Sequence, residues 1–293
     1  MDNDKLEGKR AAMDQWADTV RAELAHLITD KPAKIIYHYT DVNGLIGLIE
    51  NGSIRATHAS RLNDSSENKH GFKLVIEYVR SNFPKSSQPL IEKALLKVQS
   101  VDTYVACYST KSNSLSQWRN YTGGRVGYSL GFETNQMASL DGKMPLLEQV
   151  IYEDVKAKAL LDLLLQKVDN FLNTNPFGEV EIGYLLGTVE AMLNIIACVI
   201  KHPKFEEESE YRQIFRPSST GLKLEPFFRA GNFGLTPYVE IQFSKDKKIP
   251  LKNITIGPCL DFDIERNALK ILLDKNGYDG VEILDSMIPL RVS

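Results

Sequence analysis

The sequence predicts an α+β protein with a mostly antiparallel mixed sheet and a helical insertion. Short strands separated by frequent turns follow one another between Thr103 and Tyr152, which favours antiparallel pairing. The alternation of strand and helix that is typical of a doubly wound parallel sheet is missing there. Two long helical stretches then precede further strands, so we interpret residues 153–201 as a helical insertion into one sheet.

The first predicted element is an N-terminal helix at residues 10–29. Trp16, Val20 and Leu24 recur at helical spacing, with charged residues between them. Pro32 cannot continue the helix, because proline has no backbone N–H group and fixes φ.

A strand, a turn and a second helix follow. Residues 34–39 are rich in isoleucine and tyrosine and predict a strand. Thr40 then occupies the expected N-cap position of a helix, and Gly52 the position of a left-handed C-cap. Residues 54–58 predict the next strand.

The rest of the chain continues as one predicted domain, residues 1–293, without a linker or an internal repeat. Its periodicity predicts helices at 69–81, 89–99, 114–121, 155–172, 180–200 and 264–275. It predicts strands at 103–109, 126–133, 146–152, 210–215, 237–243, 253–256 and 281–284.

Composition excludes several classes of protein. The net charge of −3 gives no basic footprint for nucleic acid at the level of the whole chain. No run of about 18 apolar residues and no secretory signal is seen, so we expect a cytoplasmic protein without a membrane partner. The cysteines Cys107, Cys198 and Cys259 lie far apart, which predicts buried thiols in a reducing compartment.

The common catalytic motifs are absent from the sequence. It has no phosphate-binding Gly-x-x-x-x-Gly-Lys loop and no dinucleotide Gly-x-Gly-x-x-Gly fingerprint after a strand. It also has no His-Glu-x-x-His pair and no Cys-x-x-Cys pair, so we expect no metal site.

The first candidate binding residues are His38 and Thr40, at the end of the first strand. Tyr37 and Tyr39 share one face of that strand, while His38 and Thr40 share the other. The second face lies beside a helix N-terminus, whose free N–H groups suit a phosphate or a carboxamide oxygen. The alternative is a histidine bonded within the sheet and a threonine that only caps the helix.

The second candidate set lies on the predicted helix 114–121. Trp118 and Tyr121 are three residues apart, so a helix stacks them on one side, and Arg119 is adjacent. Aromatic rings beside a guanidinium can hold a nucleotide base or a nicotinamide ring. The alternative is core packing of the two rings with a solvent-facing arginine.

The third candidate set follows a run of glutamates. Glu210 and Arg212 begin a predicted strand at positions i and i+2, so they face the same side. An arginine neighbour keeps a carboxylate ionised, and such a carboxylate can stabilise an oxocarbenium-like transition state. Glu207 and Glu208 are alternatives for this role, and a solvated acidic turn is the alternative for the whole run.

Together these residues resemble a large bacterial family known as a domain of unknown function. The resemblance extends from about Ile35 to Arg291. Its pieces are His38-Tyr39-Thr40, Asn63-Asp64 with Glu67, Cys107-Tyr108-Ser109, Ser116-Gln117-Trp118-Arg119 with Tyr121, Glu210-Tyr211-Arg212, Ile256-Gly257-Pro258, and Ser286 with Ile288-Pro289-Leu290-Arg291.

A more distant resemblance is to the ADP-ribosyltransferase fold, whose opening also reads strand, His-x-Thr, helix, strand. The resemblance implies an ADP-ribosyltransferase-like sheet and NAD as a substrate. It gives His38 and Thr40 a role in anchoring NAD, and Tyr121 or Trp118 a role in stacking the nicotinamide. Glu210, oriented by Arg212, supports departure of nicotinamide. The remaining candidate binding residues are Tyr39, Asn63, Arg119 and Arg212, and the resemblance implies that Asn63 and Asp64 lie on the loop that borders the pocket.

The resulting hypothesis is an NAD-consuming ADP-ribosyltransferase or NAD glycohydrolase, acting as a bacterial toxin or anti-phage effector. Its acceptor would be water, a protein or a nucleic acid. The first alternative is a non-catalytic module that senses a nucleotide or a phage protein. The second is a nucleic-acid-processing protein that uses the carboxylates of Asp64, Glu67 and Glu210.

Overall fold

The strands form one mixed sheet in the computed structural model, which describes residues 2–29, 33–62, 65–83, 88–98, 103–122, 125–137, 146–175, 178–216, 225–231 and 234–289. They are β1 (Ile35–Asp41), β2 (Ser53–His58), β3 (Tyr104–Ser109), β4 (Gly127–Glu133), β5 (Leu146–Gln149), β6 (Glu210–Phe215), β7 (Phe227–Gly231), β8 (Gly234–Gln242), β9 (Leu251–Ile256) and β10 (Glu282–Asp285). Within these described ranges the order is β10-β9-β4-β1-β3-β2-β8-β7, and β6 pairs with β3 and β5.

Almost every pairing in this sheet is antiparallel. The exception among the described strands is β9 with β10, which run parallel. A parallel pair needs a crossover connection, and the helix between β9 and β10 supplies it. The predicted α+β class with a mostly antiparallel mixed sheet is therefore confirmed.

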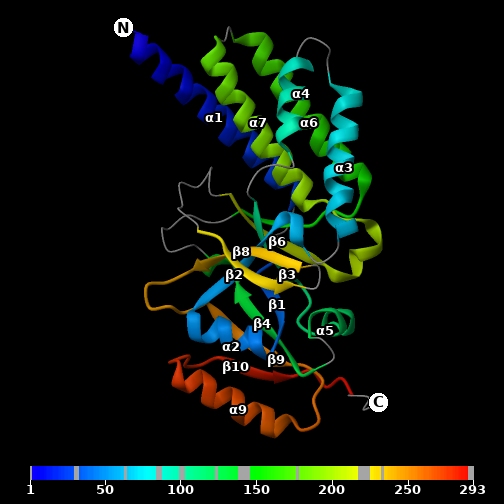
Figure 1. Cartoon of the computed structure of the whole chain (residues 1–293), viewed down its shortest axis with the longest axis vertical. Coiled ribbons are helices and arrows are strands. Elements are labelled where there is room, and N and C mark those ends of the chain that lie inside the picture. The colour runs from blue at the N-terminus through cyan, green and yellow to red at the C-terminus, as the bar shows by residue number, and fades with distance from the viewer. Residues whose placement is uncertain are drawn as a thin grey trace.

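Helices lie on both sides of the sheet, as Figure 1 shows, and one group gathers at the end of the molecule that carries the N-terminus. Those at one end are α1 (Asp2–Ile28), α3 (Ser65–Asn82), α4 (Gln88–Lys97), α6 (Asp154–Thr174) and α7 (Glu179–Val199). The others are α2 (Val42–Asn51), α5 (Leu115–Tyr121) and α9 (Phe262–Lys275), with short 3-10 turns at η1 (Ala59–Arg61), η2 (Thr134–Gln136) and η3 (Pro203–Glu208). We call α1, α3, α4, α6 and α7 the helical lobe.

Two apolar cores result from this arrangement. The lobe helices pack on one another and on β3 and β6 through residues such as Val105 and Ile214. Helices α2 and α9 cover the opposite face, where Ala106 on β3 and Phe215 on β6 are buried. Neighbouring residues of a strand point to opposite faces, so β3 and β6 contribute to both cores.

The lobe contains more than the predicted insertion. Helices α6 and α7 occupy the expected block 153–201, and α1 contacts both of them. Helix α3 also contacts both, while α4 packs against α7. The N-terminal helix begins at Asp2, earlier than the predicted residue 10.

Helix α7 is the most apolar element of the lobe. Among the described residues, the stretch 181–199 alone has the length and composition of a membrane span, and 56% of it is buried inside the protein. Its residue Glu190 is also buried and accepts a hydrogen bond from Arg216 at 3.2 Å. These are the properties of a core helix.

The β1–α2–β2 unit has the predicted order of strand, helix and strand, but the N-cap of its helix differs from the prediction. Thr40 lies inside β1, and the N-cap of α2 is Asp41, whose Oδ1 accepts a hydrogen bond from the Gly44 N–H at 2.8 Å. Gly52 ends the helix with φ 59°, the left-handed C-cap that the sequence predicts. Thr40 packs so close to α2 that a Cβ at position 44 would lie 1.8 Å from its hydroxyl.

Candidate functional site

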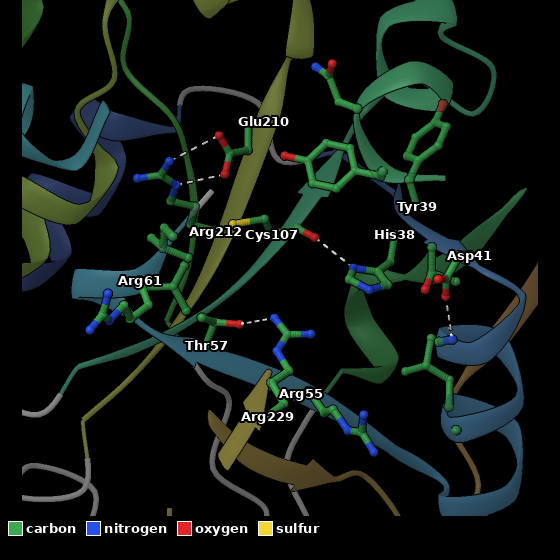
Figure 2. Close-up of a pocket in the computed structure, with 18 of the residues that line it drawn as sticks. His38, Tyr39, Asp41, Arg55, Thr57, Arg61, Cys107, Glu210, Arg212 and Arg229 are labelled. Carbon is green, nitrogen blue, oxygen red and sulfur yellow. Dashed lines mark hydrogen bonds and ion pairs between the residues drawn. The ribbon is translucent and has the colours of Figure 1, made fainter. Parts of the chain in front are cut away.

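A cavity of about 440 Å³ opens where β1 and β3 separate (Figure 2). These two strands share one paired position, Tyr37 with Ser109, whereas β1 pairs with β4 along its whole length. Side chains of β1, α2, β2, β3, α5, β6 and β7 line the cavity. Its volume lies within the range of about 300–1,000 Å³ that is typical of sites for small ligands.

Four buried charged side chains form one cluster at this cavity, and we call them the floor tetrad: Lys201, Glu208, Glu210 and Arg212. Lys201, Glu210 and Arg212 line the cavity, and Glu208 lines a small cavity beside it. Arg212 donates from Nε to Glu210 Oε1 at 2.8 Å and from a terminal nitrogen to Oε2 at 3.2 Å. Lys201 bridges the two glutamates, at 2.9 Å to Glu208 and 3.1 Å to Glu210. Each residue is no more than 4% exposed, so two acids and two bases neutralise one another out of water.

The tetrad keeps Glu210 ionised. Burial raises the pKa of this carboxyl, but the charges of Arg212 and Lys201 outweigh burial and lower it to about 2. The same pairing confirms that Glu210 and Arg212 face one side of β6. Arg212 also donates to the Cys198 carbonyl oxygen, so its guanidinium is held inside the protein even though it lines the cavity.

The structure distinguishes the three candidate glutamates. Glu210 lines the cavity and also a small neighbouring cavity, and Glu208 lines the smaller one. Glu207 is exposed and lines neither. Ser209, with φ 46° and ψ 52°, makes the left-handed turn that separates Glu208 from Glu210 and lets both reach Lys201.

His38 lies on the wall opposite β6 and lines both cavities (Figure 2). Its Nδ1 donates to the carbonyl oxygen of Cys107 on β3 at 2.9 Å, because a carbonyl can only accept. This bond links β1 to β3 beside the point where they separate. Burial lowers the pKa of His38, so the ring is neutral near pH 7.

Tyr121 and Thr40 also lie where the sequence predicts a binding role. Tyr121 lines both cavities from the end of α5, and burial together with the charge of Glu210 raises the pKa of its phenol. Thr40 lines the larger cavity. Burial and the charge of Glu210 also raise the pKa of the Cys107 thiol, which therefore stays protonated near pH 7.

Tyr39 and Trp118 instead hold α5 in place. The Tyr39 hydroxyl donates to the Lys111 carbonyl at 2.6 Å and accepts from the Ser114 N–H at 3.0 Å. Trp118 is 3% exposed, packs edge-on against Tyr39 and donates from Nε1 to Asn113 Oδ1 at 2.8 Å. Tyr39 lines part of the cavity and Trp118 lines none of it, so the predicted stacking role is left to Tyr121.

The other predicted positions do not join the cavity in the described residues. Arg119 is exposed on α5 and lies outside the lining. Asn63 and Asp64, like the side chain of Glu67, fall outside the described residues. Ser286 is buried, and its carbonyl accepts from Asn113 Nδ2 at 2.7 Å, which ties the C-terminal segment to the turn before α5.

Sequence reasoning missed the cationic mouth of the cavity, which we define as Arg55, Arg61 and Arg229. They come from β2, η1 and β7 and line the same cavity as His38. Arg229 donates to the Thr57 hydroxyl at 3.0 Å, while Arg55 meets Glu240 at 3.4 Å. The sequence offers one signal for Arg55, which alternates with apolar neighbours on a strand, and β7 is not predicted at all.

No metal site accompanies this cavity within the described ranges. No group of three or more His, Cys, Asp or Glu side chains there is placed to hold a metal ion.

Part of the chain matches a known protein family. Residues 117–213, which are 97 of the 293 residues, match a family described as "Protein of unknown function (DUF2971)". The predicted resemblance to a domain of unknown function is thereby confirmed for this segment. The segment carries Tyr121 and the whole floor tetrad, whereas His38 and the mouth arginines lie outside it.

Comparison with curated proteins finds no match, and comparison with solved structures finds none either.

Proposed function

We propose that this protein is an NAD-consuming, ADP-ribosyltransferase-like enzyme. The observation that carries the proposal is the convergence of His38, Thr40, Tyr121 and Glu210 on one cavity, although they are far apart in sequence. These are the positions to which the resemblance assigns the anchoring of NAD, the stacking of nicotinamide and the support of its departure. Positive charge at the mouth adds a place for the diphosphate.

The floor tetrad gives Glu210 the properties that the reaction needs. In the proposed step the bond between nicotinamide nitrogen and ribose carbon breaks, and its electron pair stays with nicotinamide. The ribosyl group becomes cationic, and an ionised carboxylate beside it stabilises that charge. Glu210 Oε1 accepts a hydrogen bond from Arg212, and in the proposed complex a ribose hydroxyl donates to the same carboxylate.

Water or a macromolecular acceptor then completes the reaction. The attacking oxygen forms a bond to the ribose carbon and releases its proton to solvent. The cellular setting that we propose is a cytoplasmic bacterial toxin or anti-phage effector, because uncontrolled consumption of NAD stops growth.

Release of nicotinamide tests this proposal. Purified protein is incubated with NAD, alone and with cell extract, and free nicotinamide is measured by chromatography. We expect release by the wild type and a loss of about 100-fold or more in Glu210→Gln, as is typical when transition-state stabilisation is removed. Glu207→Gln is the matched control, because Glu207 is exposed and lines neither cavity.

Two further measurements separate loss of chemistry from loss of folding. Thermal unfolding is recorded for every variant, and Tyr121→Phe removes a hydroxyl beside the floor without touching the tetrad. A wild type that releases no nicotinamide with or without extract, although it binds NAD, would overturn the enzymatic proposal.

One observation favours a second candidate, a module that binds a nucleotide without cleaving it. Both carboxylate oxygens of Glu210 are already engaged, because Arg212 contacts each of them and Lys201 contacts Oε2. A neutral tetrad can serve as the rigid floor of a sensor. Recovery of intact NAD after long incubation with protein that binds it would support this candidate.

A further inference from the structure

The β7–β8 hairpin carries the most unusual described surface outside the floor. All residues of β7 are exposed, including Phe227 at 51% and Phe228 at 57%. The hairpin continues the sheet from β2, whose Arg55 and Thr57 line the cavity.

Strand register places Phe227 on the same face as the cavity. Thr57 on β2 lies opposite Tyr238 on β8, and Tyr238 lies opposite Phe227 on β7. Directly opposite residues of paired strands share a face, and so do residues i and i+2 of one strand. Phe227 therefore shares the face of Thr57 and Arg229, whereas Phe228 points to the other face.

A stack of flat groups leads from the mouth to Phe227. The Arg55 guanidinium lies 5.0 Å from the centre of the Tyr238 ring, and the Phe227 ring lies 5.8 Å from Tyr238 with 30° between the planes. Tyr238 is 8% exposed and is covered by this stack. Phe227 is half exposed, so part of its ring surface is free to receive another flat group.

Arg229 brings positive charge to the same place. Its bond to Thr57 Oγ1 joins it to a neutral group, and no ion pair to it occurs among the described residues. Partial burial and the charge of Arg55 lower its pKa, and its own charge contributes to lowering the pKa of His38. Arg55 shares its charge with the Glu240 carboxylate at 3.4 Å, and the Arg229 guanidinium beside it favours an anion at the cavity mouth.

We propose that the β7–β8 hairpin and β2 form a clamp for a nucleoside diphosphate, in which Arg55 and Arg229 bind the phosphates and Phe227 stacks on the base. The identification of this ligand as the adenosine diphosphate part of NAD rests on the function proposed above. The nicotinamide end then lies toward Tyr121 and Glu210. Stacking on Phe227 does not select the base, because every base has an aromatic face.

Calorimetric titration of the full-length protein with ADP, AMP, adenosine and nicotinamide tests the clamp. We expect ADP to bind more tightly than adenosine, and its affinity to fall as salt is added. Phe227→Ala and Arg229→Ala should each weaken ADP binding by about tenfold, the effect of losing one stacked ring or one charged contact. Nicotinamide binding should be unchanged in both variants.

The chain offers matched controls for both substitutions. Phe228→Ala removes a ring of equal size and similar exposure from the other face of β7, and we expect ADP affinity to stay within about twofold of wild type. Arg266→Ala removes an exposed arginine on α9, outside the cavity lining. Equal weakening by Phe228→Ala, or no weakening by Phe227→Ala and Arg229→Ala, would overturn the clamp.

Other outcomes separate the clamp from the catalytic proposal. ADP binding with the expected pattern, but without release of nicotinamide from NAD, would support the clamp and contradict the proposed enzymatic activity. Release of nicotinamide with an unchanged KM for NAD in Phe227→Ala and Arg229→Ala would support the enzymatic activity and contradict the clamp. A single-stranded oligonucleotide that binds more tightly than ADP, and depends on the same two residues, would show a nucleic-acid surface in place of the clamp.

Discussion

The floor and the mouth of the cavity are both rich in charged side chains, but the partners of these side chains differ. At the floor, Lys201 and Arg212 are buried with Glu208 and Glu210 at distances of 2.8–3.2 Å. At the mouth, Arg229 meets a hydroxyl and the charge of Arg55. The floor is neutral within the fold itself. At the mouth, Arg55 has the Glu240 carboxylate at 3.4 Å, and in our proposal Arg229 gains its counter-charge from a ligand. Charge that supports folding and charge that supports binding are thus separated within one cavity.

The largest effect should come from breaking the floor with Lys201→Met. The variant leaves Glu208 without the cation at 2.9 Å and leaves two buried carboxylates facing one guanidinium. Removing one partner of a buried charge network costs about 3–5 kcal/mol. Urea denaturation should show this loss, while Lys204→Met, at an exposed position, should change stability by less than about 0.5 kcal/mol. A loss below about 1 kcal/mol for Lys201→Met would show that the tetrad is not a folding element.

Glu148 shows what a buried carboxyl does without such cations. It lies on β5, is 4% exposed and accepts a hydrogen bond from Thr29 at 3.3 Å. Burial raises its pKa from 4.5 to about 7, so the folded protein holds this proton between pH 4.5 and 7 while the unfolded chain releases it. The contribution of this group to stability is therefore present below pH 4.5 and is lost as pH rises to about 7.

Glu148→Gln should remove this pH dependence. The variant keeps an acceptor for Thr29 without a charge, so it should exceed the wild type in stability at pH 8 by roughly 2–3 kcal/mol and match it at pH 4. Urea denaturation at both pH values measures the difference, with Glu207→Gln as an exposed control. Equal stability of variant and wild type at pH 8 would contradict a raised pKa.

The turn at Ser209 gives a smaller effect. A β-branched residue is strained at φ 46°, so Ser209→Val should destabilise the protein by about 1–2 kcal/mol. Ser209→Gly, which fits a left-handed conformation, should stay within about 0.5 kcal/mol of the wild type or exceed it. Thermal unfolding of both variants measures this, and the order of their stabilities is the decisive result. If valine is tolerated as well as glycine, the left-handed turn does not fix the floor.

The smallest effect on stability is expected at the mouth. Arg229→Ala removes one hydrogen bond to Thr57 together with repulsion from Arg55, so the free energy of unfolding should change by less than about 0.5 kcal/mol. The same urea measurement as for Lys201→Met checks it. A decrease in the free energy of unfolding above about 1 kcal/mol would show that Arg229 stabilises the fold, and the mouth would then not differ from the floor.

The sequence predicts the fold better than it predicts the site. Regular periodicity locates most helices and strands, and an i, i+2 spacing places Glu210 and Arg212 on one face. Strand β7 is missed because its residues are all exposed, so its pattern lacks the alternation that burial imposes. Thr40 is mistaken for the N-cap because the strand runs two residues further than predicted, to Asp41, which has the better capping side chain.

Side-chain partners explain the errors at the site. Trp118 and Tyr121 share one helix, yet the Asn113 side chain and Tyr39 hold Trp118 in the core. Lys201 and Arg229 line the cavity, but the sequence around each of them contains no motif that indicates a binding site. Their contribution depends on long-range strand pairing, which a local reading of sequence does not contain.

The hydrogen bond between His38 and the Cys107 carbonyl has a consequence for the polarity of any ligand. It holds the proton on Nδ1, so the neutral ring carries a lone pair on Nε2. A group that binds beside this nitrogen must offer a hydrogen, as a sugar hydroxyl or an amide does, and a phosphate oxygen is repelled. His38 on the cavity wall thus favours a hydrogen-bond donor, whereas the arginines of the mouth favour an acceptor. These preferences orient a ligand with its sugar toward the inside of the cavity and its phosphate toward the mouth.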